Sequence, residues 1–284
     1  MDRFSKYNPK ATLLFFVLII IVTIVSYHPI LIAISFVGAF LYKLKLENKK
    51  AISYLLKFIL PLVLLVSVFN MLFTHYGNTV LFKAFDMNYT LEGLFYGFSQ
   101  GLMLGAVIMW ISNYSSVISA EKFLSVFGRF MPNLALLFSM VLSFIPRLKK
   151  NATEINDARL LLDNNESKIK KSINSFSALI TLTLEESIEI SNSMKSRFYG
   201  SKRTVYSKYR ICPKDYILIA FELILTAVII ALKLCGYMDF IFEPVISMGD
   251  MKLYVPILFA LLSLIPIIID FVEDMRWFYL KQKI

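Results

Sequence analysis

Long runs of apolar residues with almost no charge constrain this chain more than any other feature of its sequence. They lie at about residues 11–26, 29–42, 55–74, 91–112, 215–236 and 252–272. A helix needs about 20 apolar residues to cross a bilayer, and the first two runs are short for a full span. Hydrophobic residues make up 57% of the chain and charged residues only 18%, which excludes an ordinary soluble enzyme or a disordered chain. We therefore expect an all-α fold, a polytopic membrane helical bundle of about six spans.

The distribution of positive charge predicts which side of the membrane each loop faces. If the N-terminus is cytoplasmic, segments 1–10, 43–57, 113–214 and 273–284 are cytoplasmic and hold 27 of the 30 basic residues. Lysine and arginine collect in cytoplasmic loops of membrane proteins. We therefore expect a multi-pass protein of a cell membrane with both termini in the cytoplasm.

These segments suggest three domains. Residues 1–112 form an expected N-terminal transmembrane bundle, 113–214 a cytoplasmic or interfacial helical region, and 215–284 a C-terminal transmembrane hairpin. The middle region is too apolar for a linker, and Pro132 and Pro146 interrupt it too often for two more spans. Its apolar stretch is short, which is typical of a buried or interfacial helix.

A long amphipathic helix is predicted over residues 167–197. Neither glycine nor proline interrupts it, and apolar residues recur every three or four positions, at Ile173, Phe176, Ile180, Leu184 and Ile188. Such a helix can pack on its own bundle, lie in the membrane interface, or dock another protein subunit. Its predicted C-terminal end, with Gly200 as the expected cap, carries six basic residues: Lys195, Arg197, Lys202, Arg203, Lys208 and Arg210. This cluster favours a partner surface or lipid over nucleic acid.

The fourth apolar run contains four glycines at every fourth position: Gly93, Gly97, Gly101 and Gly105. This spacing keeps them near one face, where a neighbouring backbone can approach closely, so we expect a helix-packing role. Glu222 and Lys233 share a face of the fifth run, about three turns apart. Charge inside a membrane is often functional, but both residues lie toward the ends of the run and Lys233 can snorkel.

The sequence offers no catalytic, cofactor-binding or metal-binding motif. It lacks a phosphate-binding loop, a zinc-protease motif and a nucleophile elbow, and Cys212 and Cys235 are neither a disulfide framework nor a metal site. We therefore expect a protein that is not an enzyme and needs no cofactor. Any energy for transport would then come from partner proteins.

Four segments in the same order resemble a known family. They are residues 8–36, which open with Asn-Pro and end after His-Pro, followed by 79–107, 119–155 and 193–206. Together they are similar to the transmembrane (T) component of energy-coupling factor (ECF) transporters, the family that includes the permease subunit of cobalt transporters. The similarity extends over nearly the whole chain.

The resemblance implies a division of labour within an importer of the ABC class. The expected protein partners are two cytoplasmic ABC-type ATPases, which would hydrolyse ATP, and a small membrane subunit that binds the substrate. The lipid bilayer would surround the spanning helices. The substrate would be a vitamin or a transition-metal ion such as cobalt, and the host a bacterium. In this family, Ala-Arg-Gly-like motifs at the ends of two coupling helices insert into the ATPases.

The second such motif falls on Ser196, Arg197 and Phe198, which keeps the arginine. The first is more degenerate, because Leu162 and Asp163 stand where the family has arginine and glycine. Either Arg159, which follows Ala158 one turn earlier, takes over this contact or the docking point is weaker. Two other functions remain open: an autonomous six-span permease, and a membrane scaffold that does not transport.

Overall fold

In the computed structural model of the chain, the described residues are 3–74, 79–84, 87–128, 131–160, 167–199, 209, 211–238, 240–241, 247–248 and 252–282. The chain divides into two compact units. The first unit comprises Met1–Ser119 and Tyr209–Ile284, and the second comprises Ala120–Lys208. The first unit therefore combines the expected N-terminal bundle with the expected C-terminal hairpin, and the second lies within the expected helical region.

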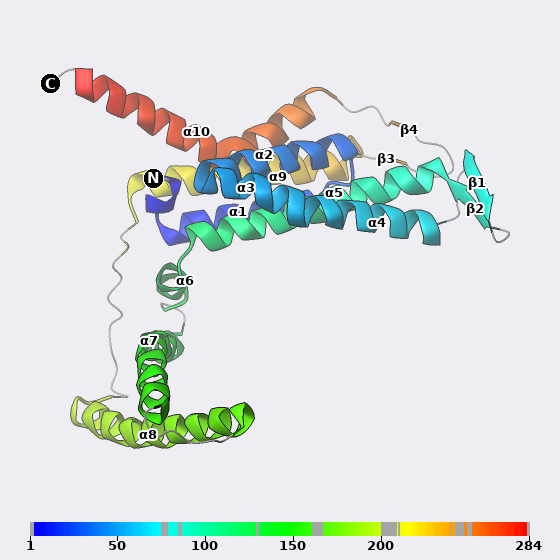
Figure 1. The fold of residues 1–284 in the computed structure, drawn as a ribbon. Helices are drawn as coiled ribbons and strands as arrows, with labels where there is room; N and C mark the ends of the chain where they lie inside the picture. Colours follow the sequence, from blue (N-terminus) through cyan, green and yellow to red (C-terminus); the bar gives the residue numbers. More distant parts are fainter. Residues whose placement is uncertain are drawn as a thin grey trace. The chain divides into compact units, whose positions relative to one another are not determined.

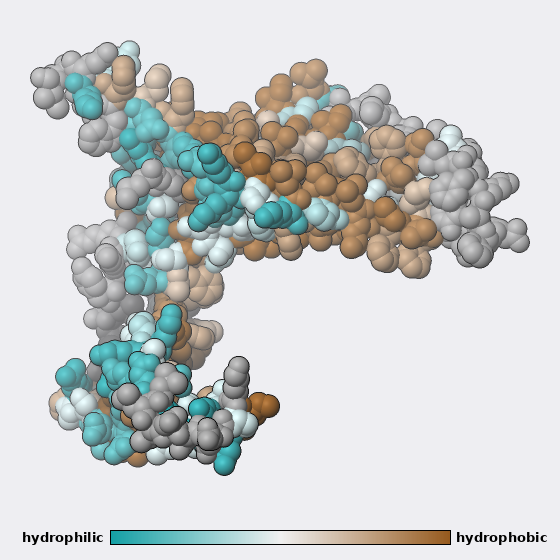
Figure 2. Space-filling model, in the orientation of Figure 1, coloured by the Kyte–Doolittle hydropathy of each residue, from teal (hydrophilic) through white to brown (hydrophobic). Residues whose placement is uncertain are grey.

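The first unit is a bundle of apolar helices (Figure 1). Its longer helices are α1 (Pro9–Val25), α2 (Pro29–Glu47), α4 (Leu60–Phe73), α5 (Leu91–Val117), α9 (Pro213–Leu234) and α10 (Tyr254–Gln282). Among the described residues, five helical segments are long and apolar enough to cross a membrane, and α1 is a shorter apolar helix of 17 residues. The prediction of an all-α, polytopic bundle is confirmed. Figure 2 shows the hydrophobic surface extending along these helices.

Proline and a capping side chain set the start of several helices. Asn8 Oδ1 accepts a hydrogen bond from the Lys10 amide (3.0 Å), and Pro9 opens α1. His28 Nδ1 accepts from the Ile30 amide (3.3 Å), and Pro29 opens α2. Proline suits the first helical position because its missing N–H has no partner there. The Asn-Pro and His-Pro pairs of the sequence are therefore two helix-start signals.

The spanning segment Lys49–Phe73 is one continuous helical stretch of three parts. α4 is preceded by α3 (Lys49–Tyr54) and a π-helical turn, η2 (Leu55–Ile59), in which the Leu60 amide donates to the Leu55 carbonyl. The next residue is Pro61, which has no amide to donate and whose ring would clash with the carbonyl four residues earlier. The widened turn relieves this crowding while it keeps the helix continuous.

Aromatic side chains fill the core between α1, α2 and α5. Phe15, Phe16 and Trp110 are buried and meet edge to face, with ring centroids 5.4–6.3 Å apart. Trp110 Nε1 donates to Ser35 Oγ (3.1 Å), which is also 2.7 Å from Thr23 Oγ1. The indole and hydroxyl groups of Trp110, Ser35 and Thr23 are thus satisfied within the bundle.

The glycine stripe of α5 packs on α4. A Cβ atom at Gly97 would lie 2.6 Å from Asn70 Cβ and 2.8 Å from the Ser67 carbonyl oxygen, and one at Gly101 would lie 2.9 Å from the Val63 carbonyl oxygen. At Gly93 the nearest atom would be the Thr74 carbonyl oxygen, at 3.0 Å. Only glycine allows the two backbones to approach this closely.

Two short β-ribbons, which the sequence did not predict, belong to the same unit. The strands β1 (Val80–Ala84) and β2 (Met87–Thr90) pair antiparallel, as do β3 (Phe240–Ile241) and β4 (Ser247–Met248). Both ribbons lie at the end of the bundle opposite the N-terminus (Figure 1). They follow α4 and α9 in the chain and connect these helices to α5 and α10.

In the part of the second unit that the structure describes there are three helices: α6 (Ala120–Phe127), α7 (Pro132–Leu160) and α8 (Lys168–Ser196). The expected interruption at Pro146 is wrong, because α7 runs through this proline for 29 residues. A proline inside a helix removes one hydrogen bond, a loss that the flanking turns of this long helix outweigh. Arg147 Nη2 lies 3.2 Å from Glu186 Oε1 and joins α7 to α8.

Candidate functional site

The apolar stripe of α8 is exposed in the second unit. Six side chains at intervals of three and four residues are 41–75% exposed: Ile169, Ile173, Phe176, Ile180, Leu184 and Ile188. The hydroxyls of Thr181, Thr183 and Ser187 each donate to a carbonyl one turn earlier in α8. These polar side chains are satisfied within the helix, so apolar contact is the main interaction that this face offers.

The C-terminal end of α8 carries the predicted second motif. Ser196 closes the helix, Arg197 is the C-cap, and Phe198 follows with φ 57°. The Phe198 amide donates to the Lys195 carbonyl (3.1 Å), and the Tyr199 amide donates to the Met194 carbonyl (3.0 Å). These two bonds form a Schellman motif.

The expected cap at Gly200 is therefore wrong, because the left-handed residue that ends the helix is Phe198. Gly200 itself lies outside the described residues. A bulky residue rarely adopts positive φ, so no residue type before Gly200 indicated an earlier end of the helix. Ser196, Arg197 and Phe198 are all exposed.

The first motif lies at the end of the other long helix. Ala158 and Arg159 belong to the last turn of α7, where Ala158 is exposed and Arg159 is half-buried. Leu162 and Asp163, which stand in place of the family's arginine and glycine, lie outside the described residues. The two candidate motifs therefore close two different helices of one unit, each with an arginine in or next to the last turn.

Several buried polar residues of the first unit were not selected from the sequence. Asp270 of α10 is 1% exposed, and its Oδ1 accepts from the Arg3 and Phe4 amides (2.9 and 3.1 Å). Its Oδ2 lies 3.1 Å from Lys45 Nζ of α2. In the sequence, Asp270 stands out only as an acidic residue at the end of an apolar run. Nothing in the sequence indicated the partners of Asp270, which lie more than 200 residues away.

A second ion pair lies within α2 and is hydrogen-bonded to two serines of α5. Lys43 Nζ lies 2.7 Å from Glu47 Oε1 and donates to Ser112 Oγ (2.9 Å), and Ser116 Oγ also donates to Glu47 (3.0 Å). These contacts fix the last turns of α5 just before the second unit begins. The bonds to Glu47 and Ser112 explain why Lys43 is buried near the end of α2.

The two charged residues of α9 occupy different environments. Glu222 is fully buried, and within the described part of the chain neither of its carboxylate oxygens has a hydrogen-bond partner. Lys233 Nζ donates to the Val25 carbonyl oxygen at the end of α1, and it lies over the Tyr27 ring. Lys233 is thus a link between α9 and α1. Across the described residues, no three His, Cys, Asp or Glu side chains gather as metal ligands.

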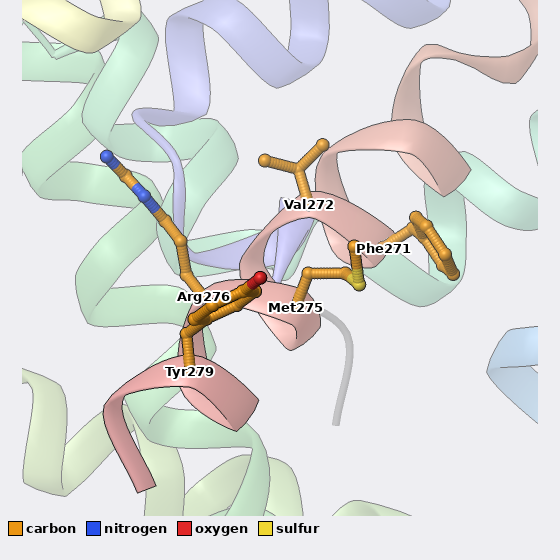
Figure 3. Close-up of a pocket in the computed structure, with 5 residues that line it drawn as sticks. All are labelled: Phe271, Val272, Met275, Arg276 and Tyr279. Carbon is orange, nitrogen blue, oxygen red and sulfur yellow. The ribbon is translucent and has the colours of Figure 1, made fainter. Parts of the chain in front are cut away.

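The C-terminal turns of α10 line an open hollow of about 650 Å³ (Figure 3). Its lining residues are Phe271, Val272, Met275, Arg276 and Tyr279. In Figure 3 the Arg276 side chain and the Phe271 ring extend to opposite sides of the helix. None of the residues predicted for the site lines this hollow. It is mainly apolar and lies on a helix that continues past the expected span.

A multi-span helical membrane protein with a separate unit of long amphipathic helices is the class that this architecture defines. The chain belongs to the cobalt transport protein family (CbiQ), whose model matches residues 4–207. This match extends from the N-terminal segment through α8 and includes both candidate motifs. A comparison with curated proteins finds no match. Membership of a transport family indicates a permease-type membrane component.

Proposed function

We propose that this chain is the transmembrane coupling subunit of an ECF-type ABC importer. Two cytoplasmic ABC-type ATPases would dock at the motifs that close α7 and α8, and a small membrane subunit would bind the substrate. The observation that carries the proposal is the second unit, whose two long helices each end near an exposed or half-buried arginine. The subunit itself is then non-catalytic.

The exposed stripe of α8 supports a protein partner for this unit. An amphipathic helix whose apolar face is exposed is suited to dock in the groove of another protein. At 1.5 Å per residue, the 29 residues of α8 extend for about 43 Å. A helix of this length without glycine or proline moves as a rigid body, so it can transmit a displacement of the ATPases to the substrate-binding subunit.

The interior of the first unit favours a coupling subunit over an autonomous permease. A solute pathway needs polar groups that face an open channel. Here Ser35 and Trp110 bond to each other, and Asn113 Nδ2 donates to the Ala39 carbonyl (3.0 Å). These three polar side chains thus join neighbouring helices, and the backbone of α4 lies against Gly97 and Gly101.

The substrate class follows from the family and remains part of the proposal. Cobalt, another transition-metal ion or a vitamin would be bound by the separate membrane subunit. The proposed orientation places both termini and the second unit in the cytoplasm of a bacterial cell, because 27 of the 30 basic residues then face inward.

Affinity purification of the full chain from its native membrane in a mild detergent tests the proposal. We expect two ATPases and at least one small hydrophobic protein in the eluate, identified by mass spectrometry. Uptake of the corresponding substrate should depend on ATP and on all of these components. A folded chain that elutes alone under conditions that preserve other membrane complexes would support the autonomous permease.

Arg197→Glu is the first variant to examine. It reverses the charge at the end of α8 and should abolish co-purification of the ATPase at this site, because an arginine fork on carboxylates or carbonyls is lost. Lys170→Glu is the matched control, since it makes the same charge change in the first turn of the same helix, where the helix dipole favours an acid. Normal assembly of Arg197→Glu would show that the motif is wrongly assigned.

A further inference from the structure

Three exposed lysines lie in the first part of the spanning segment Lys49–Phe73, and we call them the lysine stripe: Lys49, Lys50 and Lys57. The segment contains no aspartate or glutamate, and no ion pair among the described residues involves these lysines. The acid that precedes the segment, Glu47, is bonded to Lys43 Nζ (2.7 Å) and Ser116 Oγ (3.0 Å). The positive charge of the lysine stripe is therefore not balanced by the segment that carries it.

Lys57 lies at the edge of the hydrocarbon core of the membrane. The helix beyond η2, α4, has 14 residues and extends for about 21 Å at 1.5 Å per residue. The two residues between Lys57 and α4 add about 3 Å. The hydrocarbon core is about 30 Å thick, so this length alone does not cross it. Lys57 must therefore extend its side chain toward the membrane surface, where its charge needs a counter-charge.

The π-helical turn η2 brings Lys57 closer to the face that carries Lys49. In a regular α-helix, a residue eight positions after Lys49 is rotated by about 80° from it. A π-helical turn takes more residues than an α-helical turn, so it rotates Lys57 back toward Lys49. Ser53, which lies between them along the chain, is exposed as well. A group at the membrane surface beside Ser53 can thus be approached by both lysines.

Exposed apolar side chains border the lysine stripe. Leu56 is 56% exposed and Leu60 is 43% exposed. Tyr54 and Phe58 stack with ring centroids 5.5 Å apart, and aromatic side chains such as tyrosine are enriched at the boundary between lipid headgroups and acyl chains. The surface therefore offers positive charge next to apolar contact. This is the chemistry that binds an anionic lipid, because basic residues beside spanning helices attract lipid phosphates.

We propose that the lysine stripe binds an anionic phospholipid, with the lipid phosphate between Lys49 and Lys57 and the acyl chains along Leu56 and Leu60. The occupant is a lipid and not an acidic protein, because the apolar side chains that border the stripe belong to a membrane span. The inference goes beyond the proposed function and does not depend on it, since neither an ATPase nor a transported substrate takes part. The bound lipid fixes the depth of α4 in the bilayer.

The test titrates the purified full chain, in a neutral detergent, with phosphatidylglycerol and with phosphatidylcholine of the same acyl chains. Native mass spectrometry measures the bound lipid. We expect phosphatidylglycerol to bind more tightly. Lys57→Gln should lower the affinity for phosphatidylglycerol about 5-fold, as for the loss of one lysine beside an anionic lipid, and leave the affinity for phosphatidylcholine unchanged. Lys57→Arg keeps the charge and should bind both lipids as the wild type does.

Lys214→Gln is the matched control. It removes an exposed lysine from the first turn of another spanning helix, α9, where the next residue is the buried acid Asp215. The net charge of the protein changes by the same amount, but the affinity for phosphatidylglycerol should stay within twofold of the wild type. Lys49→Gln is a second variant of the stripe, with the same expected loss as Lys57→Gln, in case the change within the apolar run prevents folding.

Three results would overturn the inference. The first is equal affinity of the wild type for the two lipids. The second is an equal loss of phosphatidylglycerol affinity in Lys57→Gln and Lys214→Gln, which would show an effect of net charge only. The third is that Lys57→Gln binds phosphatidylglycerol as the wild type does but no longer retains a protein that co-purifies with the chain, which would make the stripe a protein interface. None of these results bears on the docking of ATPases, which Arg197→Glu tests separately.

Discussion

Buried polar side chains of the first unit bond mainly to backbone groups. Asp270 holds the amides of Arg3 and Phe4, and Asp215 accepts from the Asn8 and Cys212 amides at 3.3 and 2.7 Å. Removal of such an acceptor leaves buried amides without a partner, which typically costs about 1–3 kcal/mol for each group. These residues therefore stabilise the bundle, and none of them needs a ligand to explain its presence.

His28 leads to a prediction about pH. The residue is 1% exposed, its ring lies 5.1 Å from that of Phe240, and burial lowers its pKa below the ordinary value of about 6.5. His28 then binds a proton more readily in the unfolded chain than in the folded chain. The contribution of neutral His28 to the stability of the fold is therefore present above pH 6.5 and is lost as the pH falls below it. Protonation also removes the acceptor that caps α2.

His28→Asn should reduce this pH dependence. Asparagine can still accept from the Ile30 amide as a helix cap but does not titrate. We expect the thermal midpoint of the wild type to fall between pH 7 and pH 5 by more than that of the variant, measured in the same detergent. If the thermal midpoints of the two proteins fall equally between pH 7 and pH 5, His28 does not contribute to the pH dependence of stability.

At the scale of elements, the pairing of α4 with α5 depends on the absence of side chains at the glycine stripe. Gly97→Ala should destabilise the protein by about 1–3 kcal/mol, since its Cβ would overlap Asn70 and the Ser67 backbone. Gly105→Ala is the matched control, because its nearest atom is Ile59 Cγ2 at 3.0 Å, on a side chain that can move. At position 105 the higher helix propensity of alanine relative to glycine offsets the cost of the close approach to Ile59.

Equilibrium unfolding of both variants in mixed micelles measures the difference. The expected order of stability is Gly105→Ala above Gly97→Ala. Equal stabilities would indicate that α4 moves away from α5 without cost, and the stripe would then have no special packing role.

The spanning helices were predictable, because each requires a long apolar run, and α1, α2, α5 and α9 also begin at a proline or a capping residue. The finer features depended on tertiary structure. The π-helical turn at Leu55–Ile59 reflects a local conflict with Pro61, and α7 continues through Pro146 although the proline alone favours an ending. The β-ribbons lie between apolar runs, in segments that carry no strong strand pattern.

The candidate site was predictable in part. Arg197 and Phe198 could be assigned from a resemblance to other sequences, but the left-handed backbone of Phe198 could not, because its residue type opposes it. Periodicity gave the apolar stripe of α8, and the structure adds that this stripe is exposed. The ion pairs of Lys43 and Asp270 escaped notice because sequence does not show which distant residues meet.

At the scale of the whole molecule, the two native cysteines can test the proposed orientation. Cys212 and Cys235 cap opposite ends of α9, about 33 Å apart along its 22 residues, and both are exposed. With the termini in the cytoplasm, a membrane-impermeant thiol reagent applied to intact cells should label Cys235 and not Cys212.

Two single-cysteine variants make this labelling unambiguous. Cys212→Ser should be labelled in intact cells, and Cys235→Ser only after the membrane is permeabilised. The reverse pattern would place the second unit outside the cell, where ATPases have no nucleotide, and would refute the coupling role.

The contact of Asp270 with the N-terminal segment has a consequence for the order in which the protein is completed. The Arg3 and Phe4 amides are synthesised before their acceptor, which lies 266 or 267 residues later in the chain. During synthesis these amides must wait until the last helix has entered the membrane. A chain truncated before α10 would therefore leave the Arg3 and Phe4 amides without this acceptor, and the segment around them should then be cleaved by proteases more readily than in the intact protein.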